Sequence, residues 1–262
     1  MNNFMMLVGL PGSGKSTFAE HFIDCKIFSS DGLRKELWGD ESIQGNNTEL
    51  FTELHKRIKK ALRDGEDCIY DATNINAKRR MAFLNEIKDI NCRKFCTAII
   101  TDFDLCVERN AQRDRKVPYD VIKKMYLSFD IPHLREGWDN ILIAVNRKHD
   151  KSYNITELVD HLSTIPHDNP HHVLSIGDHI IATTNRIREK YSLSFAGDIE
   201  RLNALSVAAF CHDIGKEFCK TFQKPNGELD DIAHYYGHEN VSAYMFILYT
   251  KGMLENLEDI LY

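Results

Sequence analysis

The stretch GLPGSGKST, residues 9–17, follows directly on the apolar run FMMLV and constrains the fold more than any other part of the chain. Its spacing, Gly-x4-Gly-Lys-Ser, is that of a phosphate-binding loop, which requires a buried strand before it and a helix after it. Glycines let backbone N–H groups converge on phosphate oxygens, and the dipole of the helix favours the same negative charge. We therefore expect a strand at 4–8 and a helix from about Lys15.

This loop predicts how a nucleoside triphosphate binds. Lys15 is expected to reach the β- and γ-phosphates, and the Ser16 hydroxyl is expected to ligate Mg²⁺. The predicted ATP-binding residues are Gly9, Pro11, Gly12, Ser13, Gly14, Lys15, Ser16, Thr17, Arg109 and Arg113. The alternative is a chance glycine-rich turn.

Apolar runs alternate with amphipathic runs from the start of the chain to Asn146. Five runs are typical of buried strands: 4–8, 26–31, 68–74, 95–100 and 140–145. Helical periodicity or helix-start signals follow them: 15–24, 32–38, 48–63, 76–90, 104–113 and 118–129. This alternation predicts an α/β fold with a five-stranded parallel sheet covered on both faces.

The pattern changes after Asn146. A short amphipathic helix and a Pro/His/Asp/Asn segment come first, and from His171 onward only helical runs are expected: 173–190, 198–213 and 238–250. We predict a P-loop domain at 1–150, which on the loop alone could be a kinase, an ATPase or a GTPase, a linker at 151–168 and an all-α domain at 169–262. The last is expected to be incomplete, because LENLEDILY reads as the middle of a helix.

Composition limits the partners and the compartment. The net charge of −6 predicts no bulk attraction to nucleic acid, so any such site must be a local basic patch. The 7 cysteines form no CxxC pair, which indicates reduced thiols and a cytoplasmic location. No apolar run approaches the roughly 18 residues that span a bilayer, so we expect no membrane contact and no signal peptide.

Two aspartates close predicted strands at the edge where ligands bind in such sheets: Asp31 and Asp71. A carboxylate there can orient an acceptor hydroxyl, so we expect Asp31 to be the general base. Arg34, one turn later, is expected to bind an anionic part of the acceptor. A role for Asp71 in metal binding and one in acceptor binding both stay open. The alternative for each aspartate is helix capping alone.

Arg109 and Arg113 lie four residues apart, on one face of a predicted helix, and Arg115 and Lys116 follow before Pro118. Arginines that close over a transferring phosphoryl group stabilise its charge and exclude water. This segment is therefore predicted to be a lid. The alternative is a solvated basic face.

Four segments resemble the motif blocks of the bacteriophage-type polynucleotide 5′-kinases, in the same order. They are GLPGSGKSTFAEHF, SSDGLRKELW, YDATNINAKRRMAF and DFDLCVERNAQRDRKVPYDVIKKMY, within about residues 4–130. The resemblance implies transfer of the ATP γ-phosphate to a 5′-hydroxyl end of RNA or DNA. It implies catalytic roles for Asp31, Lys15 and Arg113, and acceptor contacts by Arg34, Asp71, Asn74 and Arg80.

The adjacent pair His212-Asp213 lies on an apolar helical run, where two polar groups need partners. A metal ion is the simplest partner for an imidazole and a carboxylate. With His179 and His238 on neighbouring predicted helices, and with HDIGK and YGHENVSA, the region resembles the HD phosphohydrolase superfamily. The resemblance implies a site of His179, His212, Asp213 and His238, holding Mn, Fe, Ni or Zn, with Lys216 on a substrate phosphate.

The region offers further candidates for that site. Asp259 is the one late candidate for a closing ligand, and His234 is a further possibility. A surface role is the favoured interpretation for His171 and His172. A hydrogen-bonded helix pair is the alternative for His212-Asp213.

A 5′-hydroxyl kinase joined to a phosphoesterase predicts nucleic-acid end healing: one part restores a 5′-phosphate, and the other hydrolyses 2′ or 3′ phosphoesters. ATP and Mg²⁺ are the expected cofactors and an RNA ligase is an expected partner. A basic groove with Arg34, Arg79 and Arg80 would favour this hypothesis. The alternatives are a small-molecule kinase fused to a nucleotide phosphohydrolase, and an ATP-sensing regulatory module.

Overall fold

The computed structural model describes residues 1–41, 43, 45–192, 194 and 198–250, and the chain divides into two compact units. The first unit holds residues 1–126 and 130–149. The second holds residues 127–129 and the described residues from Asp150 onward. The two units are described in turn.

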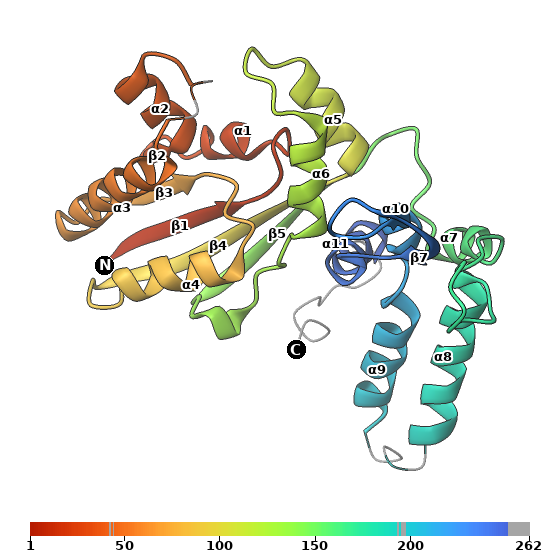
Figure 1. Ribbon diagram of the computed structural model, residues 1–262. Helices are drawn as coiled ribbons and strands as arrows, with labels where there is room; N and C mark the ends of the chain where they lie inside the picture. Colours follow the sequence, from red (N-terminus) through yellow and green to blue (C-terminus); the bar gives the residue numbers. More distant parts are fainter. Residues whose placement is uncertain (42, 44, 193, 195–197, 251–262) are drawn as a thin grey trace. The chain divides into compact units, whose positions relative to one another are not determined.

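The first unit is built on a five-stranded sheet in the order β2-β3-β1-β4-β5, in which every neighbouring pair is parallel (Figure 1). Its strands are β1 (Asn2–Val8), β2 (Lys26–Ser29), β3 (Cys68–Asp71), β4 (Cys92–Thr101) and β5 (Asn140–Asn146). This confirms the predicted five-stranded parallel sheet. β1 lies in the centre, so the loop that follows it emerges in the middle of one sheet edge.

The register of the strands gathers the polar residues of the sequence at that edge. Asp71 lies opposite Leu7 of β1 on one side and opposite Ser29 of β2 on the other. The ends of β1, β2 and β3 therefore lie side by side, and the loops that follow them start close together.

The helices of this unit connect the strands. They are α1 (Lys15–Ala19), α2 (Ser30–Trp38), α3 (Asn47–Arg63), α4 (Ala77–Glu86), α5 (Phe103–Ala111) and α6 (Tyr119–Leu127), with a 3₁₀ turn η1 (Leu134–Glu136). The apolar stripe of α3 carries Leu50, Leu54 and Ile58, all fully buried or nearly so. Such spacing buries one helix face against the sheet.

Two helix starts differ from the sequence prediction. Asp31 was expected to end a strand, but it lies in the first turn of α2, because the Ser29 hydroxyl accepts a hydrogen bond from Gly32 N–H and starts the helix earlier. The long helix α3 was expected to start at residue 48. It starts at Asn47, because Asn46 caps it by accepting from the backbone N–H groups of Thr48 and Glu49. Both are ordinary N-caps.

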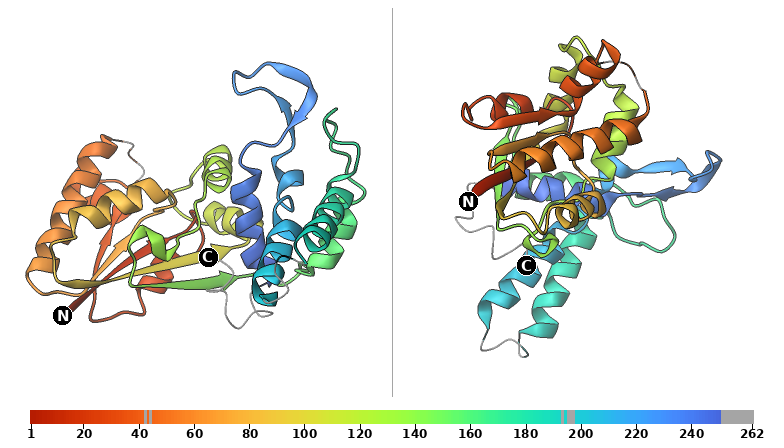
Figure 2. Two further views of the ribbon diagram at one scale, coloured as in Figure 1. Left: turned by 90° about the horizontal axis from the view of Figure 1, so that it is seen from below. Right: turned by 90° about the vertical axis from the view of Figure 1, so that its left-hand side faces the viewer.

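The second unit contains helices α7 (Ile155–Leu162), α8 (Ile176–Tyr191), α9 (Ile199–Cys211), α10 (Lys216–Cys219) and α11 (His238–Thr250). α8 and α9 lie side by side in Figures 1 and 2. α7 falls in the segment predicted as a linker, 151–168, and packs on α8. A side chain at Gly177 would collide with Val159 and Ser163, which explains the glycine.

The sequence predicted an all-α domain at 169–262, but the second unit also contains two strands. β6 (Thr221–Gln223) and β7 (Leu229–His234) form an antiparallel pair that extends away from the helices of this unit (Figure 2). Between them Gly227 has φ of 88°, next to Asn226. Asn-Gly is a strong hairpin signal, so this turn accounts for the departure from the all-α prediction. Among the described residues, no helix combines the length and apolar character needed to cross a membrane.

Candidate functional site

The loop between β1 and α1 is held in an open curve by its glycines and by α5. Gly12 and Gly14 have φ of 79° and 99°, a region that residues with a Cβ rarely adopt. A side chain at Gly12 would also collide with the Cys106 carbonyl of α5. The backbone of the loop can therefore follow the curve that a phosphate group requires only with glycine at these positions.

The ends of three other strands fix this loop from outside. The Ser13 carbonyl accepts hydrogen bonds from the Thr101 hydroxyl (2.8 Å) and from Asn146 Nδ2 (3.2 Å), at the ends of β4 and β5. Gly9 N–H donates to the Thr73 carbonyl at 3.0 Å, beyond the end of β3. Neither Thr101 nor Asn146 carried a motif that the sequence analysis could recognise.

Lys15 lies buried beneath the loop. Its Nζ donates to the carbonyls of Gly9 (3.0 Å) and Leu10 (2.8 Å). Burial lowers the pKa of Lys15, while the nearby charges of Asp71 and Asp31 oppose that shift. Both predicted carboxylates are therefore close enough to act on the lysine of the phosphate loop.

Ser16 and Asp71 form a direct pair across the sheet edge. Ser16 Oγ donates to Asp71 Oδ2 at 2.8 Å, and Asp71 is only 5% exposed. A hydroxyl backed by a carboxylate at this place in the loop suits Mg²⁺, which prefers oxygen ligands and keeps several waters. This contact favours metal binding over acceptor binding for Asp71, the choice that the sequence had left open.

Asp31 is surrounded by guanidinium groups. Arg34 Nη1 lies 3.4 Å from Oδ1, Arg113 Nη2 lies 3.5 Å from Oδ2, and Arg115 also contacts Oδ1. Its side chain stays 28% exposed, so a ligand can reach it. The sequence predicted Arg34 and Arg113 as site residues, whereas it placed Arg115 in the lid without assigning it a contact.

The segment predicted to be a lid, residues 113–117, is held at its base by Asn110. Asn110 Nδ2 donates to the Val117 carbonyl (2.9 Å), and Val117 N–H donates back to Asn110 Oδ1 (3.0 Å). This reciprocal pair closes the loop that carries Arg113 and Arg115 toward Asp31. Arg109 remains near the phosphate loop, since a side chain added at Gly14 would lie 3.7 Å from Arg109 Nη1.

Arg80 does not agree with its predicted role in acceptor binding. Its side chain is 0% exposed and forms a double salt bridge with Glu136, at 2.7 Å and 2.6 Å. A third hydrogen bond runs from Nη1 to the Asn74 carbonyl. Arg80 is thus a buried structural residue, and the exposed neighbour Arg79 is the basic group that faces solvent.

Asn74 also has an internal partner. Its φ of 47° is unusual for a residue with a side chain, and Nδ2 donates to the Leu7 carbonyl at 2.9 Å. The side chain predicted as an acceptor contact therefore ties the turn after β3 to the end of β1.

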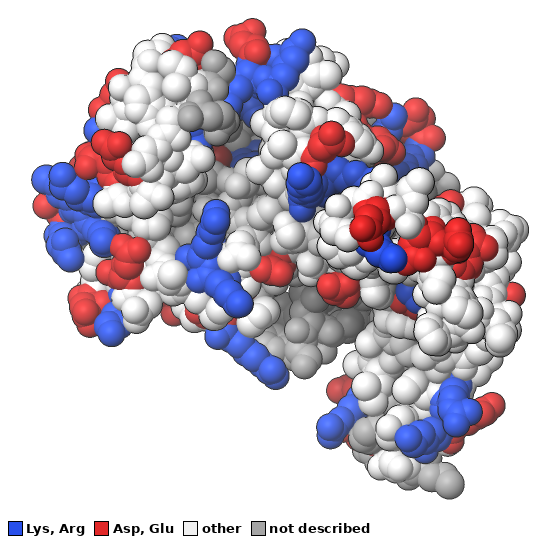
Figure 3. Space-filling view, in the orientation of Figure 1, with Lys and Arg blue, Asp and Glu red and all other residues white. Residues whose placement is uncertain are grey.

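Charged side chains on the face in Figure 3 are of both signs and interspersed. No single sign of charge covers the surface in that view.

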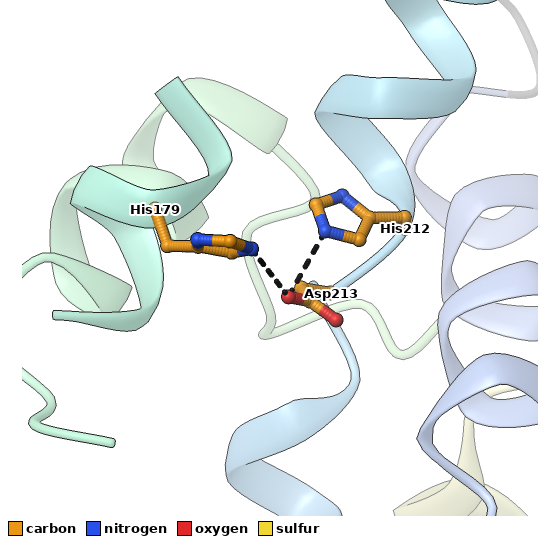
Figure 4. A group of neighbouring side chains, drawn as sticks. All are labelled: His179, His212 and Asp213. Carbon is orange, nitrogen blue, oxygen red and sulfur yellow. Dashed lines mark ion pairs between the residues drawn. The ribbon is translucent and has the colours of Figure 1, made fainter. Parts of the chain in front are cut away.

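The second unit brings together all four predicted residues of its histidine site. Asp213 Oδ2 lies 3.0 Å from His212 Nε2 and 3.4 Å from His179 Nε2, and Oδ1 lies 3.4 Å from His238 Nε2. Figure 4 shows the two imidazoles of His179 and His212 pointing at one carboxylate oxygen. Asp213 is 2% exposed and comes from the turn after α9.

The charges of this cluster are unevenly distributed. Burial would raise the pKa of Asp213, but its interactions with His212 and Lys216 outweigh burial and hold that pKa well below its usual range. Contact with Asp213 raises the pKa of His212, whereas burial lowers that of His179. The carboxylate is therefore ionised at neutral pH.

The cluster fits a divalent metal ion by its donor chemistry. One ligand atom from each of His179, His212 and Asp213 lies within 4.8 Å of the others. Asp213 Oδ2 is buried, and no donor is aligned on it for a hydrogen bond. Two imidazoles and a carboxylate with an unfilled lone pair match the ligands of transition metals.

The remaining residues predicted for this region lie in different places. His234 pairs with Asp230 at 3.0 Å and is not part of the cluster. His171 is exposed, but His172, expected to be a surface residue, stacks on His167 at 4.1 Å between ring centroids. Asp259 lies outside the described residues.

Lys216 and His167 complete the inner side of the cluster. Lys216 Nζ lies 2.8 Å from Asp213 Oδ2 and 3.2 Å from His167 Nε2. The predicted phosphate contact is thus already engaged with the carboxylate. His167 is 1% exposed and was not recognised from the sequence, since it lies in a segment rich in proline and asparagine.

Comparison with known families gives a match over residues 4–132 to a family described as an AAA domain. The matched residues include the phosphate loop, Asp31, Asp71 and the lid, so they support a P-loop domain in the first unit. The match ends at residue 132 and does not cover the second unit from Asp150 onward.

A curated relative and solved structures are similar to parts of the chain, and three examples follow. An L-seryl-tRNA(Sec) kinase from Methanococcus maripaludis is 31% identical over 163 residues, 57% of this chain and 61% of that protein. A kinase structure from Chloroflexus aurantiacus is 15% identical, with a TM-score of 0.47, covering 55% of this chain and 88% of that one. A chain of the Pnkp1/Rnl/Hen1 RNA repair complex is 22% identical, with a TM-score of 0.44, covering 47% of this chain and 42% of that one.

Proposed function

We propose that the first unit transfers the γ-phosphate of ATP to the 5′-hydroxyl end of an RNA or DNA strand. The observation that carries the proposal is Asp31, a partly exposed carboxylate held by Arg34, Arg113 and Arg115 within electrostatic range of Lys15. A general base, anion-binding arginines and a phosphate loop are the parts that phosphoryl transfer requires.

Each residue has a defined part in the reaction. Asp31 accepts the proton of the attacking hydroxyl, the hydroxyl oxygen bonds to the γ-phosphorus, and the bond to the bridging oxygen breaks to release ADP. Lys15 and the arginines of the lid stabilise the charge on the transferring group. Ser16 and Asp71 would hold Mg²⁺, which supplies charge neutralisation on the β- and γ-phosphates.

Arginines suit an acceptor that carries phosphates of its own. Arg34 Nη1 and Arg115 contact Asp31 Oδ1, and the side chain of Arg113 beside them is 39% exposed. An exposed guanidinium group can take a phosphate oxygen of the acceptor strand. This favours a polynucleotide end over a neutral small molecule.

A second candidate acceptor is the serine hydroxyl of a seryl-tRNA. The relative from Methanococcus maripaludis, an L-seryl-tRNA(Sec) kinase, favours it. This chain spans 61% of the length of that relative. In both candidates the reacting group is a hydroxyl carried by a nucleic acid.

For the second unit we propose metal-dependent hydrolysis of a 2′ or 3′ phosphoester, carried by the grouping of His179, His212, His238 and Asp213 around one buried carboxylate. A metal ion bound there would activate water. Together the two units would heal both ends of a broken strand, which an RNA ligase partner would then seal.

The test uses γ-labelled ATP with three acceptors: a 5′-hydroxyl RNA, a 5′-hydroxyl DNA and a seryl-tRNA. We expect label on a 5′-hydroxyl strand, and we expect Asp31→Asn to lose at least a hundredfold in rate while it still binds ATP. Asp64→Asn, an exposed aspartate paired with Lys60, is the matched control and should keep its activity.

The outcome separates the candidates. Label on the seryl-tRNA alone would move the assignment to the second acceptor. Label on none of the three, with ATP still bound, would overturn transfer to nucleic acid and favour a small acceptor. Full activity in Asp31→Asn would remove that residue from its proposed role.

A further inference from the structure

The imidazole ring of His167 is held in contact with Lys216 by hydrogen bonds that fix its orientation. Its Nδ1 lies 2.8 Å from the Leu174 carbonyl, which can only accept, so Nδ1 carries the proton. Nε2 of the neutral ring is then an acceptor, and it faces Lys216 Nζ at 3.2 Å. The backbone is held as well, because Tyr235 donates its hydroxyl to the His167 carbonyl.

Lys216 in turn is enclosed on three sides. Its Nζ lies 2.8 Å from Asp213 Oδ2, 3.2 Å from His167 Nε2 and 5.3 Å from the centre of the Tyr235 ring. Although the ammonium is near Oδ2, no donor is aligned on that oxygen for a hydrogen bond. The ammonium is thus shared between the His167 acceptor and Asp213 Oδ2, and the second lone pair of Oδ2 remains for the side of His179 and His212.

We propose that His167 is a positioning residue that anchors the Lys216 ammonium beneath Asp213 and so keeps Oδ2 available to a divalent cation. Without this acceptor, Asp213 becomes the strongest hydrogen-bond partner left to Lys216. The ammonium then turns fully onto Oδ2 and competes with the cation for the same lone pair. The inference rests on the metal site proposed for the second unit.

The test titrates the full-length chain with Co²⁺ in the absence of ATP and follows the visible absorption that nitrogen ligands give this ion. We expect His167→Phe to weaken Co²⁺ binding about tenfold, within the range that residues behind metal ligands typically contribute. His167→Gln, whose amide places an acceptor near the position of Nε2, is expected to retain binding close to that of the wild type.

The variants at Lys216 show whether His167 acts through it. Lys216→Met should bind Co²⁺ at least as well as the wild type, and adding it to His167→Phe should restore the affinity that His167→Phe loses. A purely structural defect at His167 would persist in the double variant and would overturn the proposal. His234→Phe, outside the cluster, is the matched control and should change nothing, and thermal unfolding of each variant confirms that it is folded.

A second measurement does not need the metal. Nitrogen-15 shifts should show the Nδ1-protonated form of His167 and a change at Nε2 in Lys216→Met. If the wild type binds no Co²⁺ but this change occurs, the metal site fails and the pairing stands. If Co²⁺ binds but neither the shift nor the affinity responds, the role of His167 fails alone.

Discussion

Ser16 Oγ and Asp71 Oδ2 lie 2.8 Å apart and join the phosphate loop to the end of the neighbouring strand β3. The hydroxyl is on the exposed side of the contact, and the carboxylate is buried behind it. A metal ion that binds Ser16 would therefore have its charge balanced by Asp71 from behind.

Replacing Asp71 by Asn should lower kcat/KM for ATP about ten- to a hundredfold at fixed Mg²⁺, because the shape stays and the charge behind the hydroxyl is lost. Raising Mg²⁺ should recover part of this loss. Steady-state kinetics across a magnesium series measures it. An effect confined to the KM of the nucleic-acid acceptor would instead return Asp71 to acceptor binding.

Arg115→Ala should reduce kcat about tenfold with little change in the KM for ATP, because it removes a guanidinium that holds Asp31 rather than one that holds the nucleotide. The neighbouring Lys116→Ala is the matched control, since Lys116 is exposed. Equal losses in the two variants would indicate a general effect of basic charge in the lid.

Arg80→Met should lower the free energy of unfolding of the first unit by about 3–5 kcal/mol, because it leaves the buried Glu136 carboxylate without its partner. The loss can be followed by fluorescence during urea unfolding, since both tryptophans of the chain, Trp38 and Trp138, lie in this unit. Arg79→Met, on the exposed neighbour, should change stability by less than about 0.5 kcal/mol.

The pH dependence of the first unit should contain a contribution from His55. Burial lowers its pKa below 6.5, against the opposing effect of Glu86, while Tyr70 and Lys59 complete its polar surroundings. The unfolded chain then binds the proton of His55 more readily than the folded chain. The contribution of His55 to the stability of the fold is therefore present above its ordinary pKa and is lost as the pH falls through its pKa in the folded state.

His55→Gln should therefore flatten the fall in tryptophan-detected stability between about pH 7.5 and pH 5. Urea unfolding at several pH values measures this fall. A slope identical to that of the wild type would show that other groups cause the acid sensitivity.

The sheet and the phosphate loop were predictable because their determinants are local. Apolar runs of strand length and glycines at fixed spacing specify β1 and the curve that follows it, whatever packs around them. The His212-Asp213 pair was predictable for a similar reason, since adjacent polar residues at the end of an apolar run need partners, although the pair lies in the turn after α9. In the second unit the residues expected around Asp213 do meet there.

The predictions that failed concern residues whose surroundings depend on contacts with residues distant in sequence. In the sequence Arg80 cannot be distinguished from the basic residue Arg79 beside it. Its burial depends on the ion pair with Glu136, which is far along the chain. His167 lies in a polar segment, so nothing near it in the sequence indicates that it will contact Lys216. The hairpin of β6 and β7 was missed for a different reason, because its strands are only 3 and 6 residues long and carry little apolar pattern beside the Asn-Gly turn.

The bond from Asn146 to the Ser13 carbonyl has a practical consequence for dissecting the protein. A fragment that stops with the family match at residue 132 would lack β5 and expose one edge of β4. It would also lose one of the hydrogen bonds that hold the phosphate loop. Anyone who trims the chain for crystallisation or assay should leave the last strand of the sheet, Asn140–Asn146, intact.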